Sequence, residues 1–211
     1  MRMLPCGESG LLLELTSSAQ VTAVYRALHS ACDDGRLHGV RELVPAARTV
    51  LVAAEDGSTP PRERVGELIA DLGDLDHLGS PSETPAEVTI PVRYDGEDLD
   101  LVARTAELSV AEVVELHSGA EYTVAFCGFA PGFGYLTGLP EPLQQARLDD
   151  SRSRIPAGSV GVAGEFSAVY PRSSPGGWRL IGRTEQVMFD PAADPPARLS
   201  PGDIVRFEPV G

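Results

Sequence analysis

The chain has 211 residues, of which 42% are hydrophobic and 23% charged, which is the composition of an ordinary globular protein long enough for two small domains. Its 17 basic residues face 31 acidic ones, and the resulting formal charge of −14 disfavours nucleic acid and anionic membranes as partners. All of the basic residues are arginines, which excludes Schiff-base, biotin-carrier and Walker A chemistry, since each needs a lysine.

The distribution of apolar and cysteine residues also limits the protein class. No run of 18 apolar residues occurs, and the run at 11–13 lacks a preceding basic region, so we expect a soluble, cytoplasmic protein with no membrane partner. Cys6, Cys32 and Cys127 are widely spaced and form no C-x-x-C pair. We therefore expect neither a disulfide framework nor a metal site.

The first part of the chain is predicted to alternate strands and helices. Strands are expected at 10–16, 39–44 and 49–54, and helices at 19–31 and 61–72. The first helix has apolar residues at spacings of three and four, which indicates one face packed on a sheet. If 88–92 adds a last strand, this is the split β-α-β pattern of ferredoxin-like folds.

A stretch rich in Gly, Ser and Pro at 79–85 predicts a linker, so we expect domains at 1–86 and 87–211. In the second domain, Ser109 and Glu112 form a capping-box pattern ahead of a helix at 110–118, and a shorter helix is expected at 98–104. Gly/Pro turns then separate short strands, which is typical of an antiparallel barrel or sandwich. These strands are expected at 88–92, 122–126, 159–163, 168–170, 179–183, 186–189 and 204–207.

Three motifs give a more specific signal. They read Gly-Phe-Ala-Pro-Gly-Phe-Gly-Tyr-Leu at 128–136, Ile-Pro-Ala-Gly-Ser-Val-Gly at 155–161 and Ser-Pro-Gly-Gly-Trp-Arg-Leu-Ile-Gly-Arg-Thr at 174–184. With these motifs the chain resembles the family of the B-type subunit of 5-oxoprolinase, allophanate hydrolase subunit 1 and Kip-type kinase inhibitors, which also includes part of the carboxyltransferase region of urea carboxylase. The resemblance implies an α+β protein, with a ferredoxin-like N-terminal domain followed by a cyclophilin-like antiparallel β-barrel.

The resemblance also implies a partner and a reaction. Members of the family act with a larger, homologous C-type subunit to open 5-oxoproline to glutamate with hydrolysis of ATP, which would be Mg-bound and held mainly by the partner. Two alternatives stay open. The chain is then either a non-catalytic inhibitor of a sensor histidine kinase, or subunit 1 of an allophanate hydrolase or urea carboxylase-like system.

The region 147–183 is the predicted anion-binding region. It holds six arginines against three acidic residues, and a guanidinium binds carboxylate or phosphate in two-point fashion. The backbone N–H groups of Gly176 and Gly177 are expected to add a nest for an anion, with Trp178 as a wall and the Tyr135 hydroxyl in the cleft. The alternative is surface ion pairs and a tryptophan in the core. The arginines proposed as ligands are Arg147, Arg152, Arg154, Arg172 and Arg183.

Two further roles are predicted. Phe129 and Phe133 lie among glycines and are candidates for a partner interface, the alternative being that they pack in the core. His117 is the only histidine in the C-terminal half and therefore the candidate catalytic proton carrier. Its alternative role is to cap a helix C-terminus, where the helix dipole favours a cation.

Overall fold

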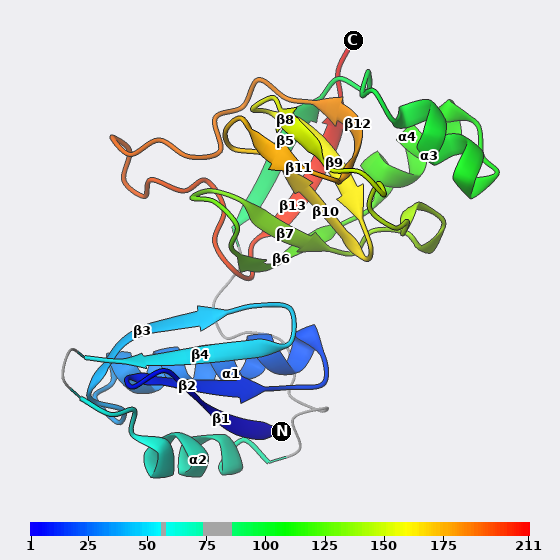
Figure 1. The fold of residues 1–211 in the computed structure, drawn as a ribbon. Coiled ribbons are helices and arrows are strands. Elements are labelled where there is room, and N and C mark those ends of the chain that lie inside the picture. Colours follow the sequence, from blue (N-terminus) through cyan, green and yellow to red (C-terminus); the bar gives the residue numbers. More distant parts are fainter. Residues whose placement is uncertain (56–57, 74–85) are drawn as a thin grey trace. The chain divides into compact units, whose positions relative to one another are not determined.

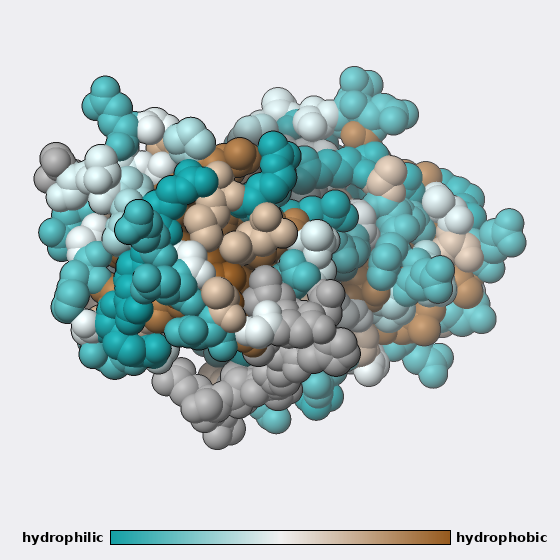
Figure 2. Space-filling view, turned by 90° about the horizontal axis from the view of Figure 1, so that it is seen from below, coloured by the Kyte–Doolittle hydropathy of each residue, from teal (hydrophilic) through white to brown (hydrophobic). Residues whose placement is uncertain are grey.

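A computed structural model describes residues 1–55, 58–73 and 86–211 of the chain (Figure 1). The described residues form two compact units, the first up to residue 73 and the second from residue 86. None of the described helices combines the length and apolar character needed to cross a membrane. Figure 2 shows one face of the molecule, on which hydrophilic side chains predominate and hydrophobic ones form small patches. The predicted linker at 79–85 lies outside the described residues.

The first unit is a four-stranded antiparallel sheet with both helices packed on one face. The strand order is β1-β2-β4-β3, and every neighbouring pair is antiparallel. Apolar residues of β2, β4, α1 and α2 share one buried cluster, so the two helices cover the same face of the sheet. The elements are β1 (Arg2–Cys6), β2 (Gly10–Glu14), α1 (Ser18–Asp33), β3 (Val40–Pro45), β4 (Thr49–Ala54) and α2 (Arg62–Ala70).

This unit confirms the ferredoxin-like prediction with one correction. The strand expected to complete the sheet, 88–92, belongs to the second unit, and the position beside β2 is taken by β1, which precedes the pattern instead of following it. β1 contains Pro5, which argues against a central strand. The sheet tolerates it because β1 is an edge strand, in which every second residue points its backbone N–H away from the sheet.

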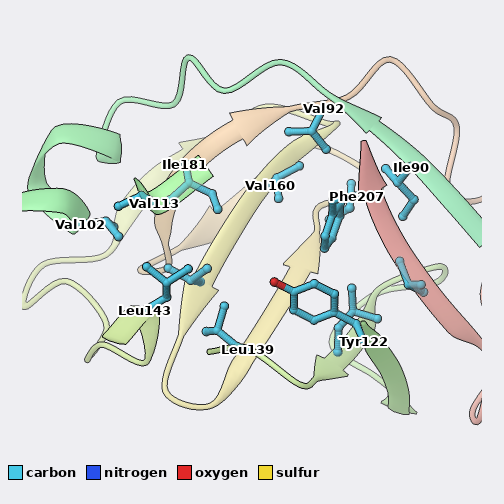
Figure 3. Packing of buried hydrophobic residues seen from close by; sticks show 14 of the residues in the cluster. Ile90, Val92, Val102, Val113, Tyr122, Leu139, Leu143, Val160, Ile181 and Phe207 are labelled. Carbon is cyan, nitrogen blue, oxygen red and sulfur yellow. The ribbon is translucent and has the colours of Figure 1, made fainter. Parts of the chain in front are cut away.

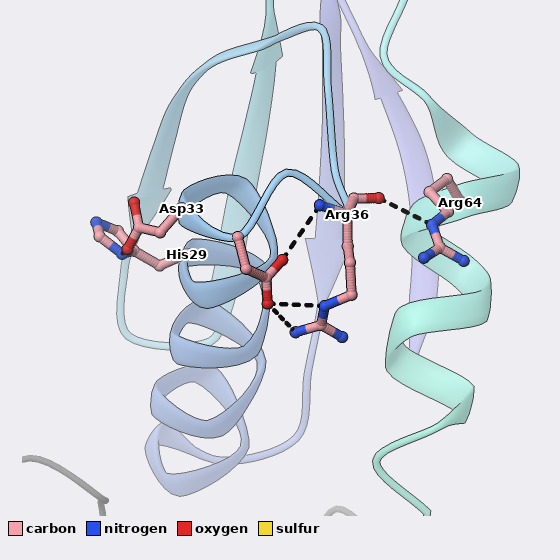
Figure 4. Close-up of polar contacts among 5 residues, drawn as sticks. His29, Asp33, Arg36 and Arg64 are labelled. Atoms are coloured by element: carbon pink, nitrogen blue, oxygen red, sulfur yellow. Dashed lines mark hydrogen bonds and ion pairs between the residues drawn. The ribbon is translucent and has the colours of Figure 1, made fainter.

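The two helices are also tied by polar contacts at the end of α1 (Figure 4). Asp34 accepts hydrogen bonds from the Arg36 backbone N–H at 3.1 Å and from its Nε at 2.8 Å. Arg64 of α2 donates from Nε to the Arg36 carbonyl at 3.0 Å. The loop after α1 is therefore held against α2, and His29 and Asp33 form an i,i+4 pair at 3.0 Å on α1 itself.

The second unit is a seven-stranded sheet in the order β12-β9-β10-β7-β6-β13-β5, with a separate two-stranded ribbon of β8 and β11. β13 pairs in parallel with β5 and antiparallel with β6. The elements are β5 (Glu87–Val92), α3 (Leu99–Ala106), α4 (Val110–Gly119), β6 (Tyr122–Cys127), β7 (Gly134–Thr137), the 3-10 turn η2 (Glu141–Leu143), β8 (Arg152–Ile155), β9 (Ser159–Ala163), β10 (Phe166–Val169), β11 (Ser174–Gly176), β12 (Arg179–Arg183) and β13 (Ile204–Pro209).

The first and last strands of this order meet and close a barrel. Arg93, just after β5, and Arg183 of β12 exchange two backbone hydrogen bonds of 2.8 Å each. The approach is so close that glycine is needed on both sides. A Cβ at Gly182 would lie 2.6 Å from the Arg93 carbonyl oxygen, and a Cβ at Gly96 would lie 2.3 Å from that of Leu180. The predicted barrel is confirmed, apart from the parallel β13–β5 pair.

The barrel interior is apolar and continuous with the inner faces of the two helices (Figure 3). Ile90, Tyr122 and Phe207 fill it from three adjacent strands, while Val102 of α3 and Val113 of α4 belong to the same buried cluster. α4 begins as predicted, because Ser109 and Glu112 make both reciprocal hydrogen bonds of a capping box. The two helices thereby cover one side of the barrel core.

One predicted strand of the second unit is wrong. Residues 186–189 form no strand, and only Phe189 makes an isolated bridge, with Ala197. β12 already pairs with β9 on one side and is bridged to Arg93 on the other, so it offers no free edge to this segment. The Gln186 N–H instead donates to the Thr184 hydroxyl at 3.1 Å in a local turn.

Candidate functional site

Seven aromatic rings gather into a second apolar cluster, distinct from the barrel interior. Strands β6, β7 and β10 and the segments beside β11 supply them, and the rings of Phe126 and Tyr135 stack with centroids 4.3 Å apart. Phe133 and Trp178 meet edge to face at 5.5 Å, the geometry that aromatic pairs prefer. We call this group the aromatic cluster; it consists of Phe126, Phe129, Phe133, Tyr135, Phe166, Tyr170 and Trp178.

Phe129 differs from the other members because it is exposed and its backbone is strained. Its relative exposure is 57%, and its φ of 65° lies in the left-handed region that non-glycine residues rarely adopt. The loop that holds it is fixed, since a Cβ at Gly132 would lie 2.6 Å from the Cβ of Phe189. The ring still contacts Phe133 and Tyr170 edge to face. Strain kept at an exposed ring favours a contact function for Phe129.

Phe133, in contrast to Phe129, is buried. Only 1% of it is exposed, and it contacts Tyr135, Tyr170 and Trp178 in addition to Phe129. A partner surface therefore cannot reach this ring without unfolding the cluster. Of the two phenylalanines predicted for an interface, the structure presents Phe129 and places Phe133 in the core, which was the alternative interpretation of the sequence.

Arg147 lies within electrostatic reach of two phenols of the cluster. Burial raises the pKa of Tyr135, and the positive charge of Arg147 lowers it in part. Burial likewise raises the pKa of Tyr170, to about 12, against the hydrogen bond from the Trp178 backbone and the charge of Arg147. Both hydroxyls thus stay protonated at neutral pH as hydrogen-bond donors, and Arg147 itself is exposed. This grouping could receive an oxyanion beside flat apolar faces.

Side chains of the protein pack closely around the predicted anion nest at 174–178. The Trp178 backbone N–H bonds the Tyr170 hydroxyl, and a Cβ at Gly176 would lie 2.6 Å from that same hydroxyl oxygen. A Cβ at Gly177 would lie 2.9 Å from the Ser151 Oγ. Trp178 is buried at 4% exposure. Gly176 therefore allows close packing against Tyr170, and Gly177 allows close packing against Ser151. The anion-binding roles of Gly176, Gly177 and Trp178 stay predictions.

Arg152 is held by carboxylates. Its Nη2 lies 2.8 Å from Asp98 Oδ1, and its Nε lies 3.3 Å from Glu97 Oε2. The second oxygen of Asp98, a residue buried at 5% exposure, accepts the Leu180 backbone N–H at 2.8 Å. The hydrogen bond to Asp98, the largest effect, raises the pKa of the guanidinium. Arg152 therefore joins the β8 ribbon to the barrel, and the ion-pair interpretation of the sequence applies to it.

The other three predicted arginines lie on or beside the β8–β11 ribbon and at the barrel closure. Arg154 donates to Ser173 Oγ at 3.2 Å across the β8–β11 ribbon, and Arg172 is exposed in the turn that precedes β11. Arg183 pairs with Asp95 at 2.7 Å beside the barrel closure, where it lines a different part of the surface. The ligand roles of Arg154, Arg172 and Arg183 stay predictions.

His117 lies in the barrel core, with no exposed surface. Its Nδ1 is 2.8 Å from the Tyr94 hydroxyl and its Nε2 is 2.9 Å from Ser167 Oγ, which in turn lies 3.4 Å from the Gly161 carbonyl oxygen. A neutral imidazole protonated on Nε2 satisfies this whole chain of hydrogen bonds. Burial lowers the pKa of His117 to about 3. We therefore assign His117 to the core and not to proton transfer with a substrate.

The burial of His117 predicts a pH dependence of stability. Above pH 6.5 the imidazole is neutral whether the chain is folded or not, while below it the unfolded chain binds a proton that the folded barrel excludes down to about pH 3. The free energy of unfolding should therefore fall as the pH drops through this window, by on the order of 1 kcal/mol per pH unit. Urea denaturation at pH 7, 6, 5 and 4 measures it. His117→Gln should give a shallower decline, and equal slopes would contradict the assignment.

Two residues of this region are not among the predicted site residues. Tyr170 organises the glycine turn through its hydroxyl, and Asp98 anchors both Arg152 and β12. The pair Tyr170-Pro171 resembles a short motif of the family, and this was the feature of the sequence that could have indicated Tyr170. Nothing in the sequence marks Asp98 as the partner of a residue 54 positions later.

Comparison with known proteins agrees with this architecture. Residues 1–199 match the family model described as carboxyltransferase domain, subdomain C and D. The chain is 39% identical to the B-type subunit of 5-oxoprolinase from Escherichia coli O157:H7, over 96% of this chain and 93% of that protein. It is 35% identical to the corresponding 5-oxoprolinase component of Bacillus subtilis, over 95% and 89% of the two chains. The chain belongs to the family of B-type 5-oxoprolinase subunits.

A more distant structural likeness links this B-type 5-oxoprolinase family member to urea carboxylase. The crystal structure of the Kluyveromyces lactis urea carboxylase superposes with a TM-score of 0.72 over 99% of this chain and 22% of that one, at 20% sequence identity. At this identity the likeness shows the fold alone. The cyclophilin-like barrel and ferredoxin-like unit expected of the family are thus the architecture observed in the structure.

Proposed function

We propose that this chain is the B-type component of an ATP-dependent 5-oxoprolinase, acting with a larger C-type subunit to open 5-oxoproline to glutamate. The observation that carries the proposal is the similarity to B-type 5-oxoprolinase subunits over nearly the full length of both chains. Their names imply further subunits, and this chain is accordingly one component of an enzyme complex. We propose that ATP and its Mg²⁺ are held mainly by the larger subunit, since this chain has no lysine for a Walker A phosphate site.

Within this function the aromatic cluster is the proposed working surface. Arg147 would neutralise a negatively charged group of the substrate, with Tyr135 beside it as a hydrogen-bond donor. Phe129 would contact the larger subunit, since a large exposed aromatic ring on a fixed loop makes a strong interface anchor. The site is then complete only when the second subunit closes over the cluster.

The proposed function is tested by co-expressing the chain with the larger homologous subunit and adding the third, separate subunit. ATP hydrolysis and glutamate formation are then measured with and without 5-oxoproline. We expect hydrolysis to rise with 5-oxoproline and glutamate to form in proportion. No stimulation, together with tight inhibition of a sensor histidine kinase by the chain alone, would replace the proposal by the kinase-inhibitor function. Stimulation by urea or allophanate instead would assign the chain to a urea carboxylase-like system.

The proposed role of Phe129 makes a prediction that separates contact from packing. Phe129→Gly removes the ring and its contacts with Phe133 and Tyr170 but also relieves the left-handed backbone, so the stability of the isolated chain should change by less than about 1 kcal/mol. Its affinity for the larger subunit should fall at least about tenfold, the usual loss for an anchor ring. Sedimentation or titration calorimetry measures the affinity, and thermal unfolding the stability. Val110→Ala, at another exposed apolar residue, is the control. Unchanged affinity would remove Phe129 from the interface.

A further inference from the structure

The closure of the barrel brings two arginines side by side. Arg93 and Arg183 are directly opposite one another in an antiparallel bridge with both backbone hydrogen bonds formed. Residues in such a pair project their side chains to the same face of the sheet, with Cα atoms about 5.5 Å apart. Like charges at opposite positions destabilise a sheet. An arginine pair at this junction therefore favours an anion that lies between the two side chains.

Neighbouring groups occupy only part of the hydrogen-bonding capacity of these arginines. Arg183 Nη2 lies 2.7 Å from Asp95 Oδ2, and the Arg183 side chain is 61% exposed. Arg93 Nη2 donates to the Gly211 backbone oxygen at 2.9 Å, and Arg93 is also exposed. A guanidinium carries five N–H donors in a planar fork. Both side chains therefore keep donors that face solvent.

The pair lies in the wall of a groove formed within the second unit. The groove has a volume of about 910 Å³, and its lining includes Arg93, Arg183 and one acidic residue, Glu185, while Asp95 pairs with Arg183 beside it. Pro91, Val187 and Val210 add apolar surface, with Val187 66% and Val210 46% exposed. Asp95 and Glu185 balance the charge of the two arginines, so the groove offers an anion the free N–H donors of the two side chains and not a net positive charge. The chemistry fits a small oxyanion that carries a short apolar part.

We propose that this groove binds a small organic oxyanion, a carboxylate or a phosphate, between the guanidinium groups of Arg93 and Arg183. The two forks would bind its oxygens in two-point fashion, and the apolar part would lie against Pro91 and the exposed valines. The groove does not include any residue of the aromatic cluster. The inference therefore concerns a second site and does not depend on the proposed function.

Binding to the full chain tests the proposal without any turnover. The Arg Nε–H signals in a nitrogen-15 correlation spectrum are followed while inorganic phosphate, and separately butyrate, is added. We expect saturable shifts of the Arg93 and Arg183 signals. A tighter response to phosphate assigns a phosphate ligand, and a tighter response to butyrate assigns a carboxylate with an apolar tail. Absence of saturable shifts with both anions would overturn the proposal.

Variants of the pair provide the second measurement. Arg183→Gln and Arg93→Gln should each weaken the tighter-binding anion at least about tenfold, the loss typical of one charge-assisted contact. The closing hydrogen bonds join backbone atoms only, so both variants should keep the wild-type thermal midpoint. Arg206→Gln, whose guanidinium pairs with Glu121 away from the groove, is the matched control and should bind as wild type. Equal affinity in Arg183→Gln and wild type would refute the site.

Discussion

Replacing Gly96 with alanine should destabilise the barrel by about 3 kcal/mol or more, because the new methyl group would lie where the backbone of β12 already is. A Cβ at this position would meet the Leu180 carbonyl oxygen at 2.3 Å and the Ile181 carbonyl carbon at 2.5 Å. These are backbone atoms of a hydrogen-bonded strand, so no side-chain rotation relieves the contact. The Gly96 N–H also donates to the Ile181 carbonyl, a bond that a displaced backbone would lose.

Urea denaturation of the Gly96→Ala chain, followed by the single tryptophan, measures this loss. Trp178 packs beside β12 and reports on the barrel specifically. The matched control is Gly119→Ala at the end of α4, where an added Cβ has nothing within 4 Å. That variant should be as stable as wild type or slightly more stable. If Gly96→Ala unfolds at the same urea concentration as the control, the closure does not depend on this contact.

Asp98→Ala is expected to lower the free energy of unfolding by about 3 kcal/mol, as much as Gly96→Ala, but for an electrostatic reason. Asp98→Ala removes the acceptor of both Arg152 Nη2 and the Leu180 N–H, and these donors lie in a site where water has little access. Breaking a buried ion pair by removing one partner leaves an uncompensated charge. Arg152 keeps Glu97 at 3.3 Å and is partly exposed, which places the effect at the lower end of the usual range.

Two further variants separate the charge effect from a general loss of packing. Asp100→Asn, at an exposed position in the first turn of α3, the helix that follows Asp98, should change the free energy of unfolding by less than about 0.5 kcal/mol. Arg152→Met combined with Asp98→Ala should recover part of the loss, because no unpaired guanidinium remains. The effects of Asp98→Ala and Arg152→Met on the free energy of unfolding are also measured separately. If the loss in the double variant equals the sum of the two single losses, the two residues are energetically independent.

The elements that the sequence predicts well are those with strong local signals. The Ser109–Glu112 capping box defines the start of α4, and the apolar stripe of α1 is buried as its spacing indicates. β9 and β12 coincide with their predicted ranges because alternating apolar residues and flanking glycines mark them. β7 is not predicted because it lies inside the glycine-rich motif, where its pairing partners β6 and β10, and not its own residues, make it a strand.

The candidate site was less predictable, because pairing across the fold decides which groups are available. Aromatic side chains pack against one another without a specific partner, so a region rich in them is expected to form a cluster. The rings of this cluster come from positions far apart in the sequence. Arginines are different, since each is directed by a specific acceptor. Arg152 binds Asp98 and Arg183 binds Asp95, and both acids precede the second domain's main strands. Charge counted along the chain therefore does not show which arginines already have a carboxylate partner.

The pairing of β5 with β13 affects how the polypeptide can be made. β5 is synthesised more than a hundred residues before β13, its hydrogen-bonded neighbour in the finished sheet. While the ribosome adds that intervening sequence, Ile90 and Val92 have no β13 to cover them, and contacts of such long range form slowly. Nascent chains stalled before residue 204 should therefore expose this strand to chaperones, whereas the strands of the first unit can pair with one another as soon as they emerge.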